Sequence, residues 1–252
     1  MEEVRLQKFL AECGINSRRG CEQMIREGKV LVNGEIAQLG QQVTPGVDRI
    51  AVEGKIVSSD EKVYIVLNKP ANVITTARDT HGRKTVMDYL EGVDERVFPV
   101  GRLDSDVEGV LLFTNDGDLA FRLMHPRFQI TKTYMAWVKG CVGDDALKRL
   151  EQGVQLEDGM TAPARAMVLQ PGGRTTLLKL VLHEGRKREV KRMCAAVGHP
   201  VEKLHRVAFA NIRVKGLRPG EWRRLSAEEV RQLYHCVGLK DASPAILPAV
   251  KE

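Results

Sequence analysis

The sequence predicts an α+β protein in which a small N-terminal domain of two helices and a β-hairpin precedes a larger domain with a mostly antiparallel mixed sheet. Apolar segments typical of strands outnumber segments with helical spacing. Hairpin turn signals recur between them, as at Asn33-Gly34 and Pro171-Gly172-Gly173. A polar stretch over 53–61 separates the first part from the rest. We therefore expect domains over 1–60 and 61–238, followed by a flexible tail over 239–252.

Local signals predict each element of the N-terminal domain. Apolar spacing over 6–10 indicates a helix that ends near Gly14. Asn16 and Ser17 are both good N-caps for a second helix. The segment 30–36 alternates around an Asn-Gly pair, which predicts a strand, a two-residue turn and a second strand.

The larger domain shows strand and helix signals in irregular order, which fits an α+β class better than a parallel α/β sheet. Runs of apolar or alternating residues predict strands over 63–67, 109–114, 132–138, 164–169, 175–182 and 207–214. Helical spacing and caps predict helices over 117–124, 144–150, 190–197 and 227–234.

Composition narrows the class of protein. Apolar residues make up 43% and charged residues 29% of the 252, which is typical of a globular chain. No run approaches the roughly 20 apolar residues of a membrane span, and the first residues lack a secretory signal. The five cysteines and six histidines are scattered and predict neither a disulfide framework nor a metal site. We expect a cytoplasmic protein without membrane partner, metal or cofactor.

Positive charge is concentrated near the C-terminus. The formal net charge of the chain is +6, yet residues 184–224 contain twelve Lys and Arg against four Glu. Because this positive charge lies in a segment with regularly spaced apolar residues, it favours a folded surface that binds a polyanion. A solvated basic surface is the alternative on charge alone.

An acidic turn lies between two apolar strands. Residues 101–109 hold three acids and Arg102 between Gly101 and Gly109. Such a loop would display Asp104 or Asp106 on a rigid scaffold, where catalytic groups are common. From the pattern alone, a solvated loop, a catalytic loop and an Asp-x-Asp magnesium site of a phosphoesterase all remain open.

The N-terminal domain resembles a known RNA-binding module. The segments 5–10 (RLQKFL), 16–19 (NSRR) and 28–34 (GKVLVNG) are similar to the alpha-L RNA-binding fold named after a small-subunit ribosomal protein. The resemblance implies RNA binding through the two helices. The basic residues on these helices and their exits are Lys8, Arg18, Arg19, Arg26 and Lys29. Arg18 and Arg19 oppose the dipole of the second helix, which makes sense if they grip phosphate.

The larger domain resembles an enzyme family. The segment 101–117 (GRLDSDVEGVLLFTNDG) is similar to the active-site signature of the pseudouridine synthases of the RsuA/RluB type. Three further pieces agree in order: Lys69-Pro70 with 82–88 (GRKTVMD), then Lys132-x-Tyr134, then 184–193 (EGRKREVKRM) with 197–198 and Leu204-x-Arg206. The likeness spans about residues 3 to 235 and is greatest to the RluB-like, large-subunit rRNA branch.

The resemblance implies a role for each matching residue. Asp104 is the implied catalytic aspartate, acting as a nucleophile or by abstracting a ribose proton. Lys191 matches its cationic partner, and Tyr134 matches the residue that packs on uracil and helps remove the proton from C5. Arg102 matches the residue that contacts the flipped nucleotide or fills its gap, and Leu204 an apolar wall. Basic residues expected to hold RNA are Arg186, Arg188, Arg192 and Arg206.

The implied partner is a structured stem-loop of ribosomal RNA, as naked RNA or within a precursor subunit, and a monomer is favoured. Because isomerisation neither adds nor removes atoms, no cofactor is needed. Small-subunit rRNA as substrate and a non-catalytic RNA-binding or ribosome-assembly factor are the alternatives. Asp106 and Glu108 are expected only to shape the loop or repel RNA.

Overall fold

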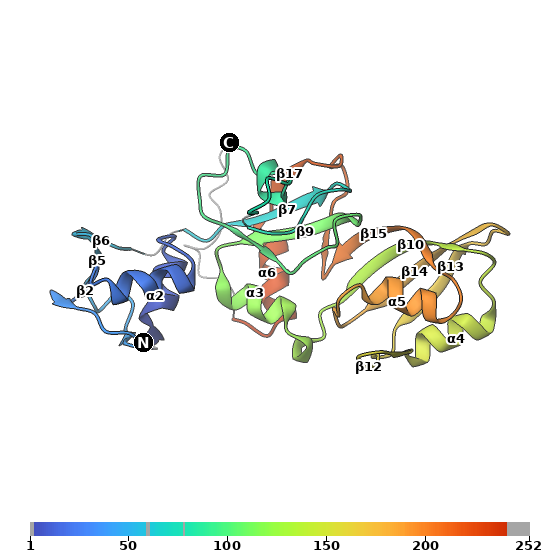
Figure 1. Ribbon diagram of the computed structural model, residues 1–252, viewed down its shortest axis with the longest axis horizontal. Coiled ribbons are helices and arrows are strands. Elements are labelled where there is room, and N and C mark those ends of the chain that lie inside the picture. Colours follow the sequence, from blue (N-terminus) through green and yellow to red (C-terminus); the bar gives the residue numbers. More distant parts are fainter. Residues whose placement is uncertain (1–2, 59–60, 78, 241–252) are drawn as a thin grey trace. The chain divides into compact units, whose positions relative to one another are not determined.

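A computed structural model describes residues 3–58, 61–77 and 79–240 (Figure 1). The chain forms two compact units, one from the first 62 residues with 94–96 and 115–117, the other from the remainder. Of the tail expected over 239–252, residues 241–252 lie outside the described part. Within the described residues no helix combines the length and apolar character needed to cross a bilayer.

The small unit contains the predicted helices and hairpin. The helices are α1, Leu6–Glu12, and α2, Arg18–Arg26, which Ser17 caps by accepting a hydrogen bond from the Gly20 N–H. The strands β2 (Val30–Val32) and β3 (Glu35–Ile36) meet at Asn33 and Gly34, whose φ angles of 54° and 92° suit a two-residue turn. The other strands are β1 (Val4–Arg5), β4 (Gln42–Val43), β5 (Ile50–Val52) and β6 (Lys55–Ile56). Leu6, Leu10 and Cys21 lie in its apolar core.

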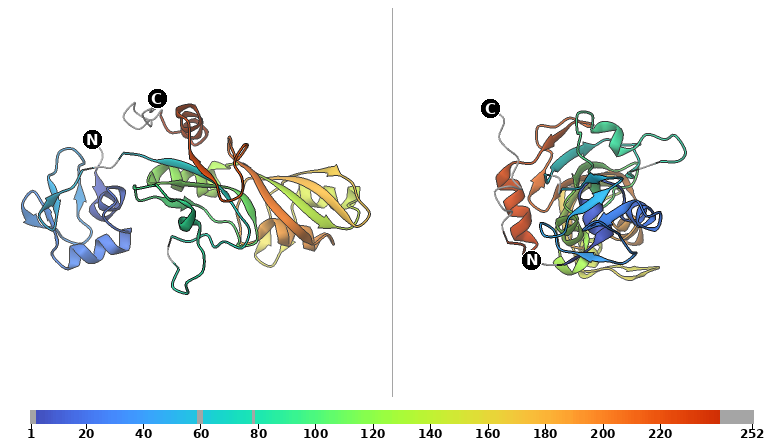
Figure 2. Two further views of the ribbon diagram at one scale, coloured as in Figure 1. Left: turned by 90° about the horizontal axis from the view of Figure 1, so that it is seen from above. Right: turned by 90° about the vertical axis from the view of Figure 1, so that its left-hand side faces the viewer.

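A mixed sheet forms the centre of the large unit (Figures 1 and 2). Its main path runs in the order β13-β14-β10-β15-β9-β7-β17, and only the β15–β9 pairing is parallel. The strands are β7 (Tyr64–Lys69), β8 (Phe98–Val100), β9 (Glu108–Thr114), β10 (Lys132–Lys139), β13 (Arg165–Gln170), β14 (Thr175–Leu182), β15 (Val201–Phe209), β16 (Ile212–Arg213) and β17 (Trp222–Arg224). The predicted α+β class with a mostly antiparallel sheet is confirmed.

Helices and short turns complete this unit. The α-helices are α3 (Gly117–Met124), α4 (Asp144–Gln152), α5 (Glu189–Ala196) and α6 (Ala227–Cys236). Two 3₁₀ turns, η1 (Val86–Tyr89) and η2 (Pro126–Phe128), and the short pair β11 (Gln155–Leu156) and β12 (Gly159–Met160) lie between them.

Both faces of β7 and β9 are buried, because their residues alternate between two apolar clusters. Val66 and Leu112 pack in one cluster with residues of α3 and α6. Ile65 and Leu111 face the other cluster, which also holds Leu103 from the loop before β9 and extends to α4 and α5. The strand and the loop that leads into it are thereby fixed from both sides.

The strand predicted over 207–214 is wrong. The chain instead forms β15 over Val201–Phe209, turns at Ala210, where φ is 50°, and returns as β16. The polar start of β15 hid it, because Glu202 and Lys203 are exposed while Leu204 is buried. The apolar run was therefore mistaken for the whole strand when it covers only one end of it and the next strand.

Strand β9 is paired along one edge by two different strands. One edge of β9 pairs with β7 over residues 109–114. The opposite edge is shared, because β8 pairs with residues 112–114 and β15 pairs with Glu108 and Gly109. Gly109 has a φ of 110°, and a Cβ there would collide with the carbonyl oxygen of Arg206. The close approach of β15 to β9 thus requires glycine. The chain leaves β8 and re-enters β9 at this fork, through residues 101–107.

Candidate active site

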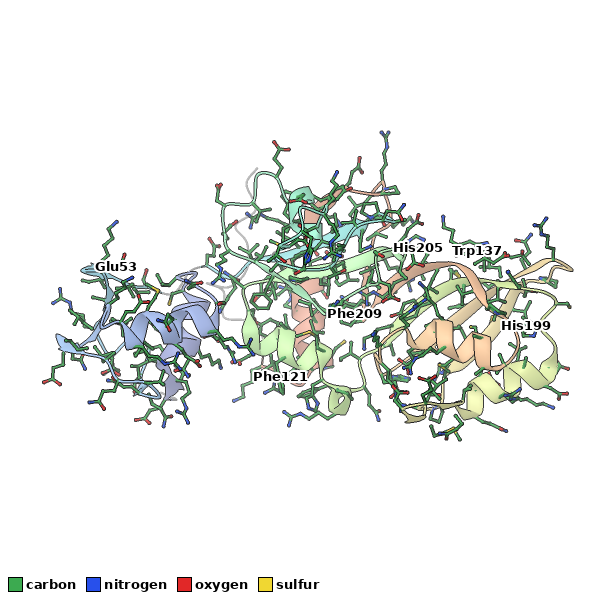
Figure 3. All side chains as sticks on the ribbon, viewed as in Figure 1. Glu53, Phe121, Trp137, His199, His205 and Phe209 are labelled. Atoms are coloured by element: carbon green, nitrogen blue, oxygen red, sulfur yellow. The ribbon has the colours of Figure 1, made fainter. Side chains whose placement is uncertain are left out.

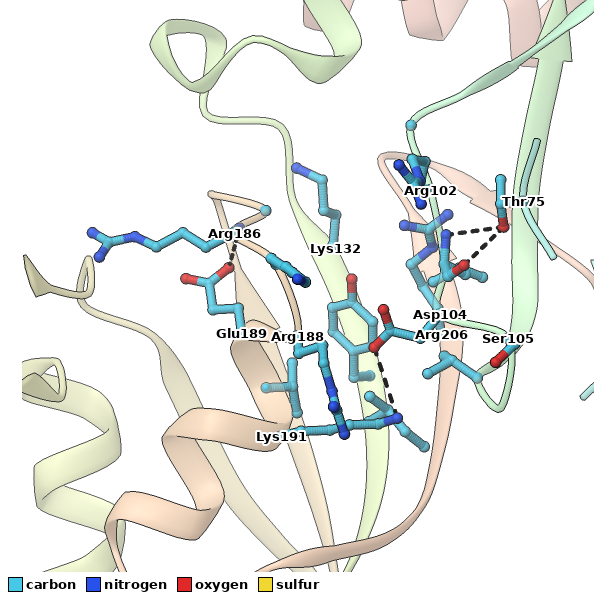
Figure 4. A pocket seen from close by; sticks show the side chains of 18 of the residues that line it. Thr75, Arg102, Asp104, Ser105, Lys132, Arg186, Arg188, Glu189, Lys191 and Arg206 are labelled. Atoms are coloured by element: carbon cyan, nitrogen blue, oxygen red, sulfur yellow. Dashed lines mark hydrogen bonds and ion pairs between the residues drawn. The ribbon is translucent and has the colours of Figure 1, made fainter. Parts of the chain in front are cut away.

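The loop at the fork forms part of the wall of a cavity of about 1080 Å³. Asp104 lies on this loop with its side chain 35% exposed. Residues from β10, β15, α5 and other segments line the rest (Figure 4). The cavity collects all five residues implied as catalytic or substrate-binding: Arg102, Asp104, Tyr134, Lys191 and Leu204.

Buried groups hold the loop in place. The Nζ of Lys69, which is fully buried, donates to the carbonyl oxygens of Pro70, Ser105 and Val107 at 2.9–3.0 Å. Thr75 adds two bonds, donating to the Leu103 carbonyl at 2.8 Å and accepting from the Leu103 N–H at 3.3 Å. Asp104 therefore stands between two anchored residues on a preorganised backbone.

Lys69 has an environment unusual for lysine. Burial lowers its pKa to about 8, against the opposing pull of nearby carboxylates. In the sequence, Lys69 stands out only as part of the Lys69-Pro70 motif. Its contacts lie up to 38 residues away, so no local pattern reveals them.

Lys191 approaches the loop from α5. Its Nζ lies 2.6 Å from both carboxylate oxygens of Asp106 and 3.7 Å from Oδ2 of Asp104. The hydrogen bond from Lys191 lowers the pKa of Asp106. Asp106 thus contacts the cation expected for Asp104, a role beyond the loop-shaping foreseen for it. Glu108 pairs instead with Lys203, at 3.1 Å.

Two strands supply the wall opposite the loop. Tyr134 on β10 is half-buried and pairs in register with Arg206 on β15 and Leu180 on β14. Leu204, 6% exposed, belongs to the same wall. A phenol ring and an apolar side chain beside a carboxylate and an ammonium group suit a planar, uncharged ring.

Arg206 is buried, unlike the other basic residues predicted to bind RNA. It is only 3% exposed, its Nε donates to the Val110 carbonyl at 2.8 Å, and its guanidinium lies 5.1 Å from the Phe209 ring centroid. The residue therefore joins β15 to β9 at the wall of the cavity. Its contact with RNA stays a prediction, and the burial of Arg206 places that contact inside the cavity and not on an exposed face.

The other predicted arginines near α5 differ in their surroundings. Arg186 lies 3.1 Å from Glu184 and donates to the carbonyl oxygens of Gly159 and Met160. Arg192 forms a bidentate pair with Asp158 at 2.9 and 3.0 Å. Arg188, at the N-terminus of α5, is exposed and lines the cavity, with a left-handed φ of 52°. Of these three, Arg188 is best placed to meet phosphate.

Two further ionisable groups line the cavity. Glu189 is 5% exposed, and burial together with the neighbouring Glu184 raises its pKa to about 8. Lys132 donates to the Ile130 carbonyl at 3.1 Å, and burial and Arg206 lower its pKa to about 8. Glu189 is part of the basic motif over 184–193, in which the sequence suggests no separate role for it. Only its burial distinguishes it from its charged neighbours.

The five basic residues of the small unit lie on the two helices and their exits, with Lys8 on α1 and the others on or just after α2. Arg18 and Arg19 begin α2, Arg26 ends it, and all three are exposed. Lys29 lies 2.7 Å from Glu27, and Lys8 lies 3.7 Å from Glu12. Arg18, Arg19 and Arg26 are the candidates most open to RNA among these five.

Over the ranges 3–58, 61–77 and 79–240, no three His, Cys, Asp or Glu side chains are grouped so that they could hold a metal ion.

Comparison with known proteins connects these features. Residues 63–196 match the family described as RNA pseudouridylate synthase, and residues 4–48 match the S4 domain. An uncharacterized RNA pseudouridine synthase of Aquifex aeolicus is 48% identical over 95% of this chain and 97% of its own length. A Bacillus subtilis protein named ribosomal large subunit pseudouridine synthase B is 47% identical over 91% of this chain and 95% of its own.

A solved structure agrees with both sequence matches. The crystal structure of a pseudouridylate synthase superimposes with a TM-score of 0.66 at 30% identity, covering 91% of this chain and 99% of that one. The resemblance expected from the motifs is confirmed over both units. The chain belongs to the RNA pseudouridylate synthase family and is a pseudouridine synthase with an N-terminal S4 domain.

Proposed function

We propose that this enzyme converts a specific uridine of large-subunit ribosomal RNA to pseudouridine, with Asp104 as its catalytic residue. The observation that carries the proposal is the position of Asp104, on an anchored loop 3.7 Å from the Lys191 ammonium and within a cavity lined by Tyr134. The name of the Bacillus subtilis relative supports the substrate class.

The target uridine leaves its helical stack to enter the cavity, because its glycosidic bond is inaccessible within a duplex. Asp104 starts the reaction at this nucleotide, with the Lys191 ammonium 3.7 Å from its Oδ2. The bond from C1′ to N1 breaks, the uracil turns, and a bond from C1′ to C5 forms. The proton lost from C5 balances the proton gained at N1.

The wall residues orient the base during this rotation. Tyr134 packs on the uracil ring and assists removal of the C5 proton, while Leu204 closes the apolar side. Arg102, exposed at the rim of the cavity, contacts the flipped nucleotide. The S4 domain holds the surrounding RNA through Arg18, Arg19 and Arg26.

Tritium release from C5 of uracil tests the proposal. The substrate is ribosomal RNA labelled at C5 and taken from cells that lack this gene. Wild type and Ser105→Ala, a control on the same loop with an exposed side chain, should both release tritium, and Asp104→Asn should release none. Turnover by Asp104→Asn would contradict the catalytic assignment, and modification mapped only to small-subunit RNA would contradict the substrate.

A further inference from the structure

Helix α3 exposes two large apolar side chains close to the cavity. Phe121 is 49% exposed and Met124 44% exposed, although Leu119, Ala120 and Leu123 of the same helix are buried in the core. Figure 3 labels Phe121 on α3. Phe121 and Met124 are three residues apart and therefore lie on one face. The helix packs on the core through its other side, so these two side chains form a separate exposed apolar face.

Cations lie against the aromatic rings of this face. The guanidinium carbon of Arg127 lies 4.5 Å from the Phe128 ring centroid and 5.8 Å from that of Phe121. That of Arg122 lies 5.3 Å from the Phe128 centroid. The His125 ring, 5.1 Å from the Phe121 centroid, accepts a hydrogen bond from the Arg127 N–H at Nδ1, at 3.2 Å. Rings and charges are thus arranged before any ligand binds.

This cluster is continuous with the active site. Met124 lines the cavity together with Gly101 and Arg102 of the catalytic loop, and its Cγ lies near Gly101. One end of the cluster therefore forms part of the wall of the cavity that holds Asp104.

We propose that Phe121, Met124 and Arg127 form a stacking subsite for an unpaired base that flanks the target uridine. Extracting one uridine leaves its neighbours without a stacking partner, and exposed aromatic rings with adjacent arginines bind such bases and their phosphates. The two arginines favour RNA over an apolar protein partner. The proposal rests on the proposed function, since it assigns a subsite of the same RNA.

Two labelled probes test the subsite. One is a fluorescein-labelled 12-mer of uridine, and the other is an abasic 12-mer with the same ribose–phosphate backbone. Phe121→Ala should weaken binding of the uridine 12-mer about tenfold, as expected for loss of one base–aromatic stack, and leave binding of the abasic probe unchanged. Met167→Ala, which removes another exposed apolar side chain (57%) on β13, is the matched control and should change neither.

Three outcomes would overturn the subsite: unchanged binding of the uridine probe by Phe121→Ala, equal loss for both probes, or a wild type that binds both probes equally. Thermal unfolding of Phe121→Ala checks that the exposed substitution leaves the fold intact. Failure of the subsite and of the proposed function are separable, because tritium release by Asp104→Asn decides only the latter.

Discussion

The ammonium group of Lys191 touches both carboxylate oxygens of Asp106 at 2.6 Å while it lies 3.7 Å from Oδ2 of Asp104. Its side chain is only 14% exposed, whereas that of Asp106 is 63% exposed. Asp106, the more exposed carboxylate, therefore holds the Lys191 ammonium in place. The positive charge of Lys191 acts on Asp104, the proposed catalytic carboxylate, from 3.7 Å. Asp104 keeps its oxygens open to substrate as a result.

Replacing Lys191 tests the importance of that charge. Lys191→Met should lower the single-turnover rate constant by about 10²-fold, the lower end of the cost of removing one preorganised hydrogen-bond donor from a reacting centre. Lys191→Arg should retain most activity, because it restores the charge. Single-turnover assays on C5-labelled RNA measure both variants. Asp106→Asn should cost less than Lys191→Met, and the reverse order would contradict the arrangement described above.

Removing the buried lysine beneath the loop should affect both stability and rate. Lys69→Met leaves the carbonyls of Pro70, Ser105 and Val107 without their donor, so we expect the free energy of unfolding to fall by at least about 2 kcal/mol. The activity should also fall, because the loop that carries Asp104 loses its anchor. Urea unfolding and tritium release measure the two effects. Lys148→Met, at an exposed position on α4 of the same unit, is the control, and equal losses in both variants would contradict the anchoring role.

The buried carboxyl of Glu189 makes stability depend on pH. Its pKa is about 8 in the folded protein and close to 4.3 in an unfolded chain, so the folded state binds the extra proton between these values. The stabilising contribution of Glu189 to the free energy of unfolding is therefore lost as pH rises from about 4.3 through 8. Glu189→Gln removes this titration while retaining an oxygen acceptor for the Arg186 N–H.

Urea midpoints at pH 5.5 and 8.5 measure the effect. Glu189→Gln should gain stability relative to wild type at the higher pH. Glu151→Gln, an exposed position on α4, should follow the wild type at both values. A difference between Glu189→Gln and wild type that is the same at both pH values would show that the buried proton is not there.

The S4 domain should contribute through its phosphate contacts. The double variant Arg18→Ala and Arg19→Ala should bind ribosomal RNA more weakly, with the slope of log K against log salt reduced by roughly 1.4 to 1.8 for two lost contacts. Lys29→Ala should change the slope less, because Lys29 is paired with Glu27. Binding titrations at several salt concentrations would settle the matter, and an unchanged slope would contradict the role of α2.

Local sequence signals predicted much of the fold because several elements carry their own boundaries. The predicted bounds of α3 and β14 coincide with those observed, since His125-Pro126 stops the helix and Pro171-Gly172-Gly173 precedes the strand. The start of β15 was missed because its polar residues conceal the alternation of a strand.

The site was foreseen in part for a similar reason. Asp104, Tyr134 and Lys191 could be identified by their motifs, and all three line one cavity. The contacts of Lys69, the burial of Arg206 and the pairing of Lys191 with Asp106 depend on segments far apart in the chain. No pattern within a single segment reports such contacts.

The absence of a side chain at residue 109 determines how the two halves of the active site meet. Asp104 precedes β9, whereas Leu204 lies on β15, Tyr134 on β10 and Lys191 on α5. A single methyl group on Gly109 would press on the carbonyl of Arg206 and push the two halves apart. Gly109 therefore permits the pairing of β9 with β15, and residues from both sides of this pairing line one cavity. The shape of the active site thus depends on the backbone pairing of β9 with β15 as well as on the side chains that line the cavity.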